Sequence, residues 1–352
     1  MKAPAFWFTP PHRPDLRARL LAPLAALRAR ALARRRAACV RWTAPVPVIC
    51  VGSLTTAGSG KAQAVLAVVG HLQAMGHKPA ILCRGTGGRS SRPVTVDVQK
   101  HTQADVSDRA LLTAAFAPTW ISRDRRQGAE ALLAVTPAGG GQTDCIVIDD
   151  GLQELHVFND ISVIVVDAAL GFGNGRSFPA GPLHEPLASG LNRADLVLSI
   201  GSDAAQSVFE RTWGAGVTCP RIRGRLELLE TGMDWRGARL VAFAGIGDSE
   251  IFFAALRGLG ADLVHCAALE ERHPPGAALI ARLEREAASR GAQLVTTELD
   301  AVRLAPEIRR KVLTLPLRLQ VAEWEPFDAA LARIGLTAGC AVTAVTPPVF
   351  PR

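Results

Sequence analysis

The sequence predicts an α/β fold with a mostly parallel sheet, and three observations support this prediction. Short apolar runs rich in β-branched residues alternate with helical stretches along most of the chain. The chain has 352 residues, which is enough for about two domains. Hydrophobic residues make up 48% of the composition and charged residues 20%, so the chain can bury a sizeable core.

The first domain is predicted over residues 43–222. Residues 46–51 (VPVICV) form an unbroken apolar run with β-branched side chains, which is typical of a strand buried in a parallel sheet. A loop of small residues follows this run, and a helical stretch follows the loop. The predicted strands are 46–51, 79–83, 145–148, 161–166 and 196–200, and the predicted helices are 61–75, 108–116 and 126–135.

A second, smaller α/β domain is predicted over residues 239–352, after a hinge at residues 223–238. The same alternation of apolar runs and helical stretches resumes there. The predicted strands are 240–244, 263–266 and 294–297, and the predicted helices are 250–259 and 277–290.

Positive charge is concentrated at the start of the chain. Residues 1–42 hold ten Lys and Arg and one Asp, a net +9, while the whole chain is +8, so the remaining 310 residues sum to −1. This distribution disfavours a surface coated with positive charge for nucleic acid. We therefore expect one basic arm on a near-neutral body, and no nucleic-acid partner.

The basic arm, residues 1–42, has the pattern of an amphipathic helix, which Pro23 should kink or divide. Its apolar positions recur every three or four residues: Leu16, Leu20, Leu24, Leu27 and Ala31. Arginines occupy much of the remaining surface, a composition typical of a helix that lies in a membrane interface and is attracted by anionic lipids.

Two other interpretations of the arm remain open. The apolar stripe would also suit a helix that docks on the protein's own core. The segment has some features of a secretory signal, but Arg28 and Arg30 end its apolar run early. No apolar run approaches the 18 residues of a transmembrane helix.

The cysteine pattern indicates neither a disulfide framework nor a zinc site. The seven cysteines are scattered and odd in number, and no CxxC or HExxH motif is present. We expect a reducing compartment.

The loop at residues 52–62 (GSLTTAGSGKA) predicts a phosphate site. Small residues between a strand and a helix allow backbone N–H groups to surround phosphates, and Lys61 would reach the β- and γ-phosphates. The strict pattern GxxxxGK[ST] fails at two positions, where Thr55 and Ala62 stand, so a glycine-rich turn without a ligand is the alternative. The candidate nucleotide-binding residues are Thr55, Thr56, Ala57, Gly58, Ser59, Gly60, Lys61 and Ala62.

Two adjacent carboxylates support this interpretation. Asp149 and Asp150 directly follow the apolar run 145–148, and P-loop proteins hold Mg²⁺ with an acid in that position. An ordinary turn at the end of a strand is the alternative. The first domain is therefore predicted to be P-loop NTPase-like, with Mg²⁺ at the phosphate site.

The chain resembles the tetraacyldisaccharide 4′-kinases, the lipid A pathway kinases of Gram-negative bacteria. Matching motifs run in the family's order over nearly the whole chain, and GNGR…PAGPL and TE-x-DAVRL are far more specific than a phosphate loop. The matching stretches are APVPVICVGSLTTAGSGK (44–61), CRGTGGR (83–89), DDGLQ (149–153), GFGNGRSFPAGPLHEP (171–186), FAGIG (243–247) and TTELDAVRL (296–304).

The resemblance implies a reaction and a setting. MgATP would phosphorylate the 4′-hydroxyl of a tetraacylated glucosamine disaccharide 1-phosphate at the cytoplasmic face of the bacterial inner membrane. The basic arm would contact the anionic inner-membrane surface, and a monomer is the simplest assembly.

The resemblance also implies residue roles. Asp108 matches the family's catalytic carboxylate, and Asp149 and Asp150 match its metal pair. Arg84 and Arg125 match family arginines that would contact phosphate, although a solvated ion pair suits both equally well. His273 lies one residue beyond the position of a family histidine that pairs with the catalytic Asp.

Several family positions carry other residues in this chain. Losing one preorganised group typically costs about 10²–10³ in rate, so several such changes allow a second interpretation, a nucleotide- and membrane-binding relative with impaired catalysis. The departures are Ala62 for Thr, Arg109 for Glu, Glu154 for His, His184 for Arg, Arg272 for His and Leu299 for Lys.

Overall fold

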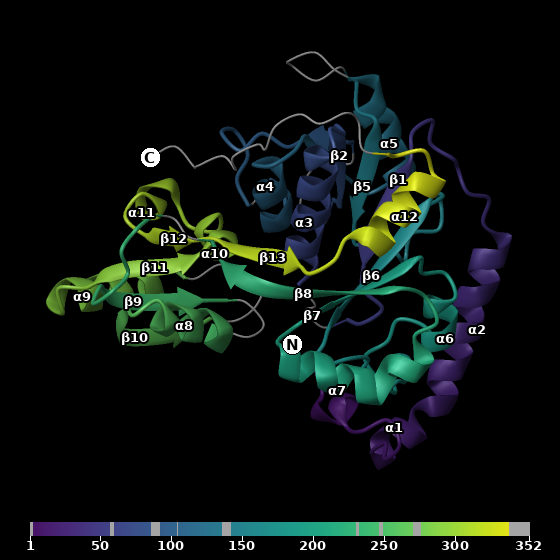
Figure 1. Ribbon diagram of the computed structural model, residues 1–352, viewed down its shortest axis with the longest axis horizontal. Coiled ribbons are helices and arrows are strands. Elements are labelled where there is room, and N and C mark those ends of the chain that lie inside the picture. Colours follow the sequence, from purple (N-terminus) through teal and green to yellow (C-terminus); the bar gives the residue numbers. More distant parts are fainter. Residues whose placement is uncertain are drawn as a thin grey trace.

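The computed structural model describes residues 3–56, 60–85, 92–103, 105–135, 142–229, 232–245, 249–269 and 276–337. Figure 1 shows a larger lobe and a smaller lobe, each built on its own sheet, with the arm along the outer side of the larger lobe. The predicted α/β class with a mostly parallel sheet is confirmed.

The larger lobe contains a nine-stranded sheet in the order β13-β8-β7-β6-β1-β5-β2-β4-β3. Its pairs are parallel except at the two edges, where β3 and β13 are antiparallel to their neighbours. The central strands are buried, which explains why they appear in the sequence as unbroken apolar runs. The strands are β1 (Val48–Gly52), β2 (Pro79–Arg84), β3 (Val94–Thr95), β4 (Thr119–Ser122), β5 (Cys145–Asp149), β6 (Ile161–Asp167), β7 (Leu196–Ile200), β8 (Arg221–Leu228) and β13 (Leu317–Val321).

Helices cover both faces of this sheet. Alternate residues of β1 enter opposite layers, because Ile49 and Val51 pack in one core cluster while Val48 and Cys50 pack in two others. On the first face lie α3 (Lys61–Ala74), α4 (Asp108–Ala114) and α12 (Glu325–Arg333). On the second face lie α5 (Arg125–Ala134), α6 (Leu187–Leu191) and α7 (Asp203–Trp213), with the short turn η2 (Gly214–Gly216) after α7.

The smaller lobe is a four-stranded parallel sheet in the order β10-β9-β11-β12. Two apolar clusters form its core, one on each face. Its strands are β9 (Arg239–Ala244), β10 (Asp262–Ala268), β11 (Gln293–Thr297) and β12 (Leu313–Leu315), and its helices are α8 (Ser249–Gly258), α9 (Ala277–Ser289), α10 (Glu298–Ala301) and α11 (Pro306–Arg309).

The boundary between the lobes differs from the predicted one. Residues 223–228 of the predicted hinge belong to strand β8, which pairs within the large sheet, and β13 pairs with it in antiparallel register (Figure 1). Helix α12 then packs on α3, where His71 stacks on Trp324 with ring centroids 4.1 Å apart. The chain therefore returns to the larger lobe after residue 316, instead of remaining in the smaller lobe to residue 352.

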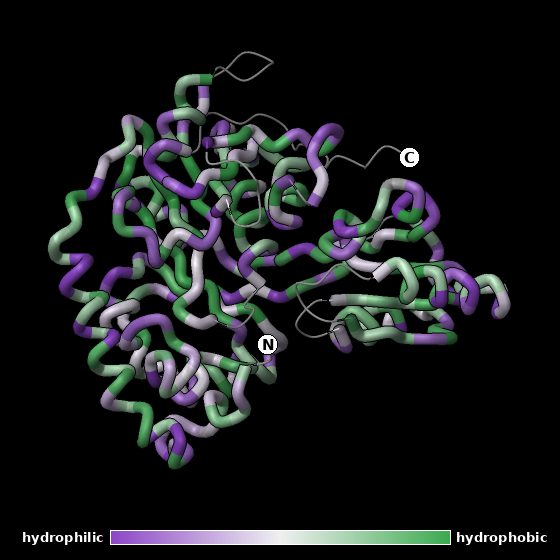
Figure 2. The backbone as a smooth tube through the Cα atoms, turned by 180° about the vertical axis from the view of Figure 1, so that it is seen from behind, coloured by the Kyte–Doolittle hydropathy of each residue, from purple (hydrophilic) through white to green (hydrophobic). Residues whose placement is uncertain are grey.

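The arm begins with the short turn η1 (Ala5–Phe8) and continues as α1 (Leu16–Leu20) and α2 (Ala22–Ala38). The division at Leu21 agrees with the effect expected of Pro23, which lies in the first turn of α2. In Figure 2 hydrophobic and hydrophilic residues alternate along this outer segment. No described helix is both long enough and apolar enough to cross a membrane.

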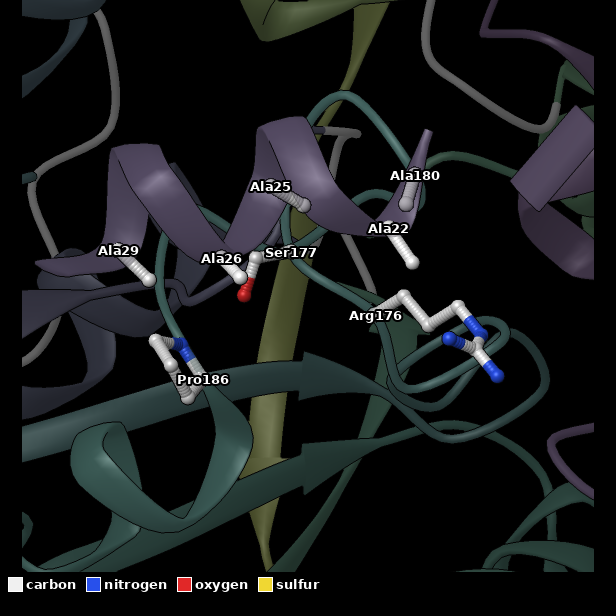
Figure 3. A pocket seen from close by; sticks show the side chains of 8 residues that line it. All are labelled: Ala22, Ala25, Ala26, Ala29, Arg176, Ser177, Ala180 and Pro186. Atoms are coloured by element: carbon white, nitrogen blue, oxygen red, sulfur yellow. The ribbon is translucent and has the colours of Figure 1, made fainter. Parts of the chain in front are cut away.

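The leucine stripe of the arm faces away from the protein. Leu16 is 72% exposed, Leu20 81%, Leu24 55% and Leu27 61%. Small residues make the contact with the body, since Ala18 and Ala25 are buried. Figure 3 shows a groove of about 180 Å³ beside Arg176 and Pro186, which α2 lines with Ala22, Ala25, Ala26 and Ala29. The interpretation that the leucine stripe docks on the core is therefore wrong.

Candidate active site

The predicted phosphate loop joins the carboxyl end of β1 to the first residue of α3, Lys61. Gly60 has φ +70°, and a Cβ there would lie 2.9 Å from Cδ1 of Ile200, so glycine suits this position for two reasons. A second segment supports the loop from the side: Thr56 N donates to Pro182 O at 3.0 Å, and His184 N donates to Leu54 O at 2.8 Å. Ala57, Gly58 and Ser59 lie outside the described residues.

Lys61 and Asp150 face each other at this end of the sheet. Nζ of Lys61 is 3.5 Å from Oδ1 of Asp150, and their side chains are 12% and 41% exposed. Asp150 has φ +58°, and among the described residues it is the one non-glycine with positive φ. Aspartate tolerates this conformation better than most residues do.

Asp149 has a different partner, although it adjoins Asp150. Nη1 of Arg109 lies 3.0 Å and 3.2 Å from the two Asp149 oxygens, and the Asp149 side chain is 6% exposed. The negative charge of Asp149 raises the pKa of the Arg109 guanidinium. Arg109 replaces a glutamate of the family pattern, and the structure gives this departure a definite partner.

Asp108 is the first residue of α4, and the smaller lobe provides its cation. Its Oδ1 accepts a hydrogen bond from Arg109 N at 2.8 Å, and its Oδ2 accepts from Nε of Arg303 at 2.7 Å and from Nη2 of Arg303. Two consecutive residues therefore have partners in different parts of the molecule. Asp108 contacts Arg303 of the smaller lobe, while Arg109 contacts Asp149 at the end of β5. Sequence reasoning missed Arg303 as a site residue, although it quoted the DAVRL motif that contains it.

Arg125 is buried between two strand ends. Its Nη1 donates to Leu82 O at 2.9 Å and its Nη2 donates to Asp149 O at 2.8 Å, and the residue is 3% exposed. Burial lowers its pKa. The guanidinium thus satisfies carbonyls at the carboxyl ends of β2 and β5, directly behind the acidic pair.

Two further predicted site residues are Arg84 and His273. Arg84 ends β2 at the same edge of the sheet and is exposed. Thr86, Gly87 and Gly88 of its loop lie outside the described residues, as do Arg272 and His273.

Of the acidic pair, Asp150 fits a magnesium site completed by the nucleotide. Asp149 is occupied by Arg109, whereas the Asp150 carboxylate is open on one side, and Ala62 offers no hydroxyl. Within the described ranges no three His, Cys, Asp or Glu side chains form a metal cluster. Mg²⁺ is commonly held by one or two carboxylates, with phosphate oxygens and waters filling its other positions. Asp150 can serve as such a ligand.

Comparisons with known proteins show the family of the chain. The family model described as tetraacyldisaccharide-1-P 4′-kinase matches residues 17–335. A protein of Jannaschia sp. named tetraacyldisaccharide 4′-kinase is 47% identical over 95% of this chain and 99% of its own length, and one of Dinoroseobacter shibae is 49% identical over 94% and 97%.

A solved structure shares the fold. It is the "apo" form LpxK from Aquifex aeolicus in complex with ATP, with a TM-score of 0.69, 22% identity and coverage of 91% of this chain and 99% of that one. The resemblance inferred from the motifs is confirmed.

Proposed function

Because this chain belongs to the tetraacyldisaccharide 4′-kinase family, we propose that the described site phosphorylates the 4′-hydroxyl of a tetraacyldisaccharide 1-phosphate with ATP, a step of lipid A biosynthesis. The observation that carries the assignment of the site is the grouping at one sheet edge. Lys61 faces Asp150 there at 3.5 Å, and Arg109, which adjoins Asp108, contacts Asp149 at the end of β5, while Arg303 of the smaller lobe contacts Asp108.

The nucleotide end of the site stabilises negative charge. The N–H groups at the start of α3 and the ammonium of Lys61 favour the β- and γ-phosphates at this helix terminus. Asp150 would hold Mg²⁺, which when bound neutralises charge on the phosphate oxygens. Arg125 would support the site from behind by fixing the carbonyl of Asp149, which keeps the turn that carries Asp150 in place.

Asp108 would act on the acceptor sugar. Phosphoryl transfer proceeds through a loose transition state, so positioning of the hydroxyl contributes more than strong basicity. A charged carboxylate that accepts a hydrogen bond from the sugar hydroxyl orients the hydroxyl oxygen for in-line attack. The carboxylate can then take the proton late in the reaction.

The arm would place this site at a lipid surface. Four leucines of the stripe are more than half exposed, and arginines flank them on α1 and α2. Such a face suits insertion into a membrane interface while the acyl chains of the substrate remain in lipid. We propose peripheral binding of a monomer to the anionic cytoplasmic face of the inner membrane.

A phosphotransfer assay tests the function. The full chain with MgATP and tetraacyldisaccharide 1-phosphate in mixed micelles should form the 4′-phosphorylated product, and Asp108→Ala should reduce the rate by about 10²–10³. Thermal melts of both proteins control for unfolding. No product above the Asp108→Ala background would instead support the impaired relative that Ala62 and the other departures suggest.

A further inference from the structure

We propose that Arg303 is a positioning residue for Asp108, so that the smaller lobe fixes the orientation of the carboxylate that meets the substrate hydroxyl. This inference rests on the role proposed above for Asp108. It concerns a residue far away in sequence, since 195 positions separate Arg303 from Asp108.

The contact has two hydrogen bonds, and it is buried on the arginine side. Both Nε, at 2.7 Å, and Nη2 of Arg303 donate to the same oxygen, Oδ2 of Asp108. The Arg303 side chain is 4% exposed, whereas that of Asp108 is 21% exposed. Arginine therefore lies behind the carboxylate, and the carboxylate retains an open side.

Arg303 is itself held from behind by a buried acid. Its Nη1 lies 3.0 Å from Oδ1 of Asp300, which is 1% exposed on its side chain. The other oxygen of Asp300 accepts hydrogen bonds from Thr297 Oγ1 and Gly245 N, both at 2.8 Å. The guanidinium thus has a fixed position relative to the ends of β9 and β11.

The same arrangement leaves little room for a side chain at position 245, which is glycine. A Cβ there would lie 3.0 Å from Oδ1 of Asp300 and 3.4 Å from Nη1 of Arg303. Gly245 of the FAGIG motif and the TE-x-DAVRL motif, separate in the sequence, therefore build one support that ends at the buried Arg303 guanidinium.

Counting acceptor positions shows what this support leaves free. An ionised carboxylate has about four acceptor positions. Arg303 uses two on Asp108, and Arg109 N uses a third at 2.8 Å. About one position remains, on the exposed side, which is what orientation of a single sugar hydroxyl requires.

A second ion pair between the lobes provides a matched control. Nη2 of Arg318 on β13 lies 2.9 Å from Oε1 of Glu298 on α10, and Glu298 is 3% exposed on its side chain. This pair also joins the two lobes, but the hydrogen bonds that the Arg318 guanidinium makes within the described residues go to Glu298 and to Leu317 O, not to Asp108. Loss of lobe-to-lobe attachment and loss of Asp108 orientation can therefore be separated.

The experiment compares kcat and KM of Arg303→Met, Arg303→Lys and Arg318→Met with the full-length wild type. We expect Arg303→Met to lower kcat about 100-fold with KM for MgATP changed less than about twofold. Arg303→Lys should recover roughly tenfold of this loss, because an ammonium restores the charge but not the paired N–H donors of the guanidinium. Arg318→Met should keep kcat within about threefold of wild type.

The Asp108→Ala background provides the decisive comparison. There Arg303→Met should cause no further loss of kcat, since a positioning residue acts only through the group that it positions. An equal loss in Arg318→Met, or a loss that persists in the Asp108→Ala background, would overturn the proposal in favour of a purely structural ion pair.

Crystal structures of wild type and Arg303→Met judge the proposal independently of turnover. The Asp108 carboxylate should rotate or become disordered in the variant, and an unchanged carboxylate would refute the positioning role. If the wild type forms no product, the proposed function fails by itself, and these structures still decide the role of Arg303. Should Arg303→Met not fold, Arg303→Lys serves in both measurements.

Discussion

Nη2 of Arg36 lies 2.9 Å from Oε1 of Glu185, and this ion pair fastens α2 of the arm to the body of the larger lobe. The Glu185 side chain is 1% exposed, and Nη2 of Arg193 donates to it at 2.6 Å. The residue just before Glu185, His184, is hydrogen-bonded to the backbone of the predicted phosphate loop. The arm and the nucleotide site therefore share one support.

Removal of the Arg36 guanidinium should destabilise the protein. Arg36→Met leaves Glu185 buried with Arg193 as its remaining cation, and loss of one partner of a buried pair costs roughly 3–5 kcal/mol. Urea unfolding should show a decrease of about 3 kcal/mol in the free energy of unfolding. Arg35→Met, on the exposed side of the same helix turn, is the matched control and should change it by less than about 0.5 kcal/mol. Equal effects of the two variants would contradict the anchoring role.

The same pair predicts an acid-dependent loss of stability. Burial alone would raise the pKa of Glu185, but hydrogen bonds and charge from Arg36 and Arg193 outweigh it and hold the pKa below its usual value of 4.5. A pKa lowered on folding contributes stability above the unfolded value, and this contribution is lost as pH falls through the folded value. The difference in unfolding free energy between wild type and Glu185→Gln should therefore be largest near pH 7 and shrink below about pH 4.5. A difference that stays constant with pH would contradict the proposed contribution of ionised Glu185 to stability.

The leucine stripe should govern binding to lipid. Leu20→Glu with Leu27→Glu places two charges on the face that we propose enters the interface, so sedimentation with anionic vesicles should fall at least tenfold. Val98→Glu is the matched control, since Val98 is 48% exposed but lies outside the arm. Undiminished sedimentation of the double variant would remove the proposed membrane face.

A hydroxyl at position 62 should improve use of magnesium. Ala62 is the second residue of α3, where P-loop proteins carry a Ser or Thr that binds Mg²⁺. Ala62→Thr should lower the Mg²⁺ concentration for half-maximal phosphotransfer by about threefold to tenfold, because water no longer has to occupy that position. Ala62→Val introduces a side chain of nearly the same size as threonine but without the hydroxyl, and it should give no such gain.

Arg125 should act mainly on stability. Arg125→Met leaves the carbonyls of Leu82 and Asp149 without this donor, and each buried unsatisfied group costs about 1–3 kcal/mol. We expect a loss of about 3 kcal/mol in thermal or urea unfolding with KM for MgATP changed less than about threefold. A large rise in KM at unchanged stability would favour the direct phosphate contact suggested by the family pattern.

The sequence predicted the central strands well because each is buried on both faces. The run at 145–148 differs from β5 by one residue for this reason. Strands β8 and β13 were missed because their polar residues alternate with apolar ones at the edge of the sheet, so RIRGRLEL and LRLQV lack an unbroken apolar run. The predicted boundary of the smaller domain was displaced by the same omission.

The site shows the same division between local and tertiary information. The sequence identified Lys61, Asp149 and Asp150 because functional residues of parallel sheets lie at the carboxyl ends of the strands. Arg109 appeared in the sequence only as a departure, and its pairing with Asp149 depends on how α4 packs. Arg303 was beyond local reasoning, because its partner belongs to the other lobe.

The antiparallel pairing of β8 with β13 makes the smaller lobe an insertion. Leu228 and Leu317 are opposite each other in register, and Leu229 N donates to Pro316 O at 2.9 Å, so the chain departs and re-enters at nearly the same point. A short turn could bridge that gap, and a gene lacking codons 229–316 would still encode all nine strands of the large sheet. One deletion would then separate the nucleotide site and Asp108, which stay in the larger lobe, from the support that Arg303 gives to Asp108.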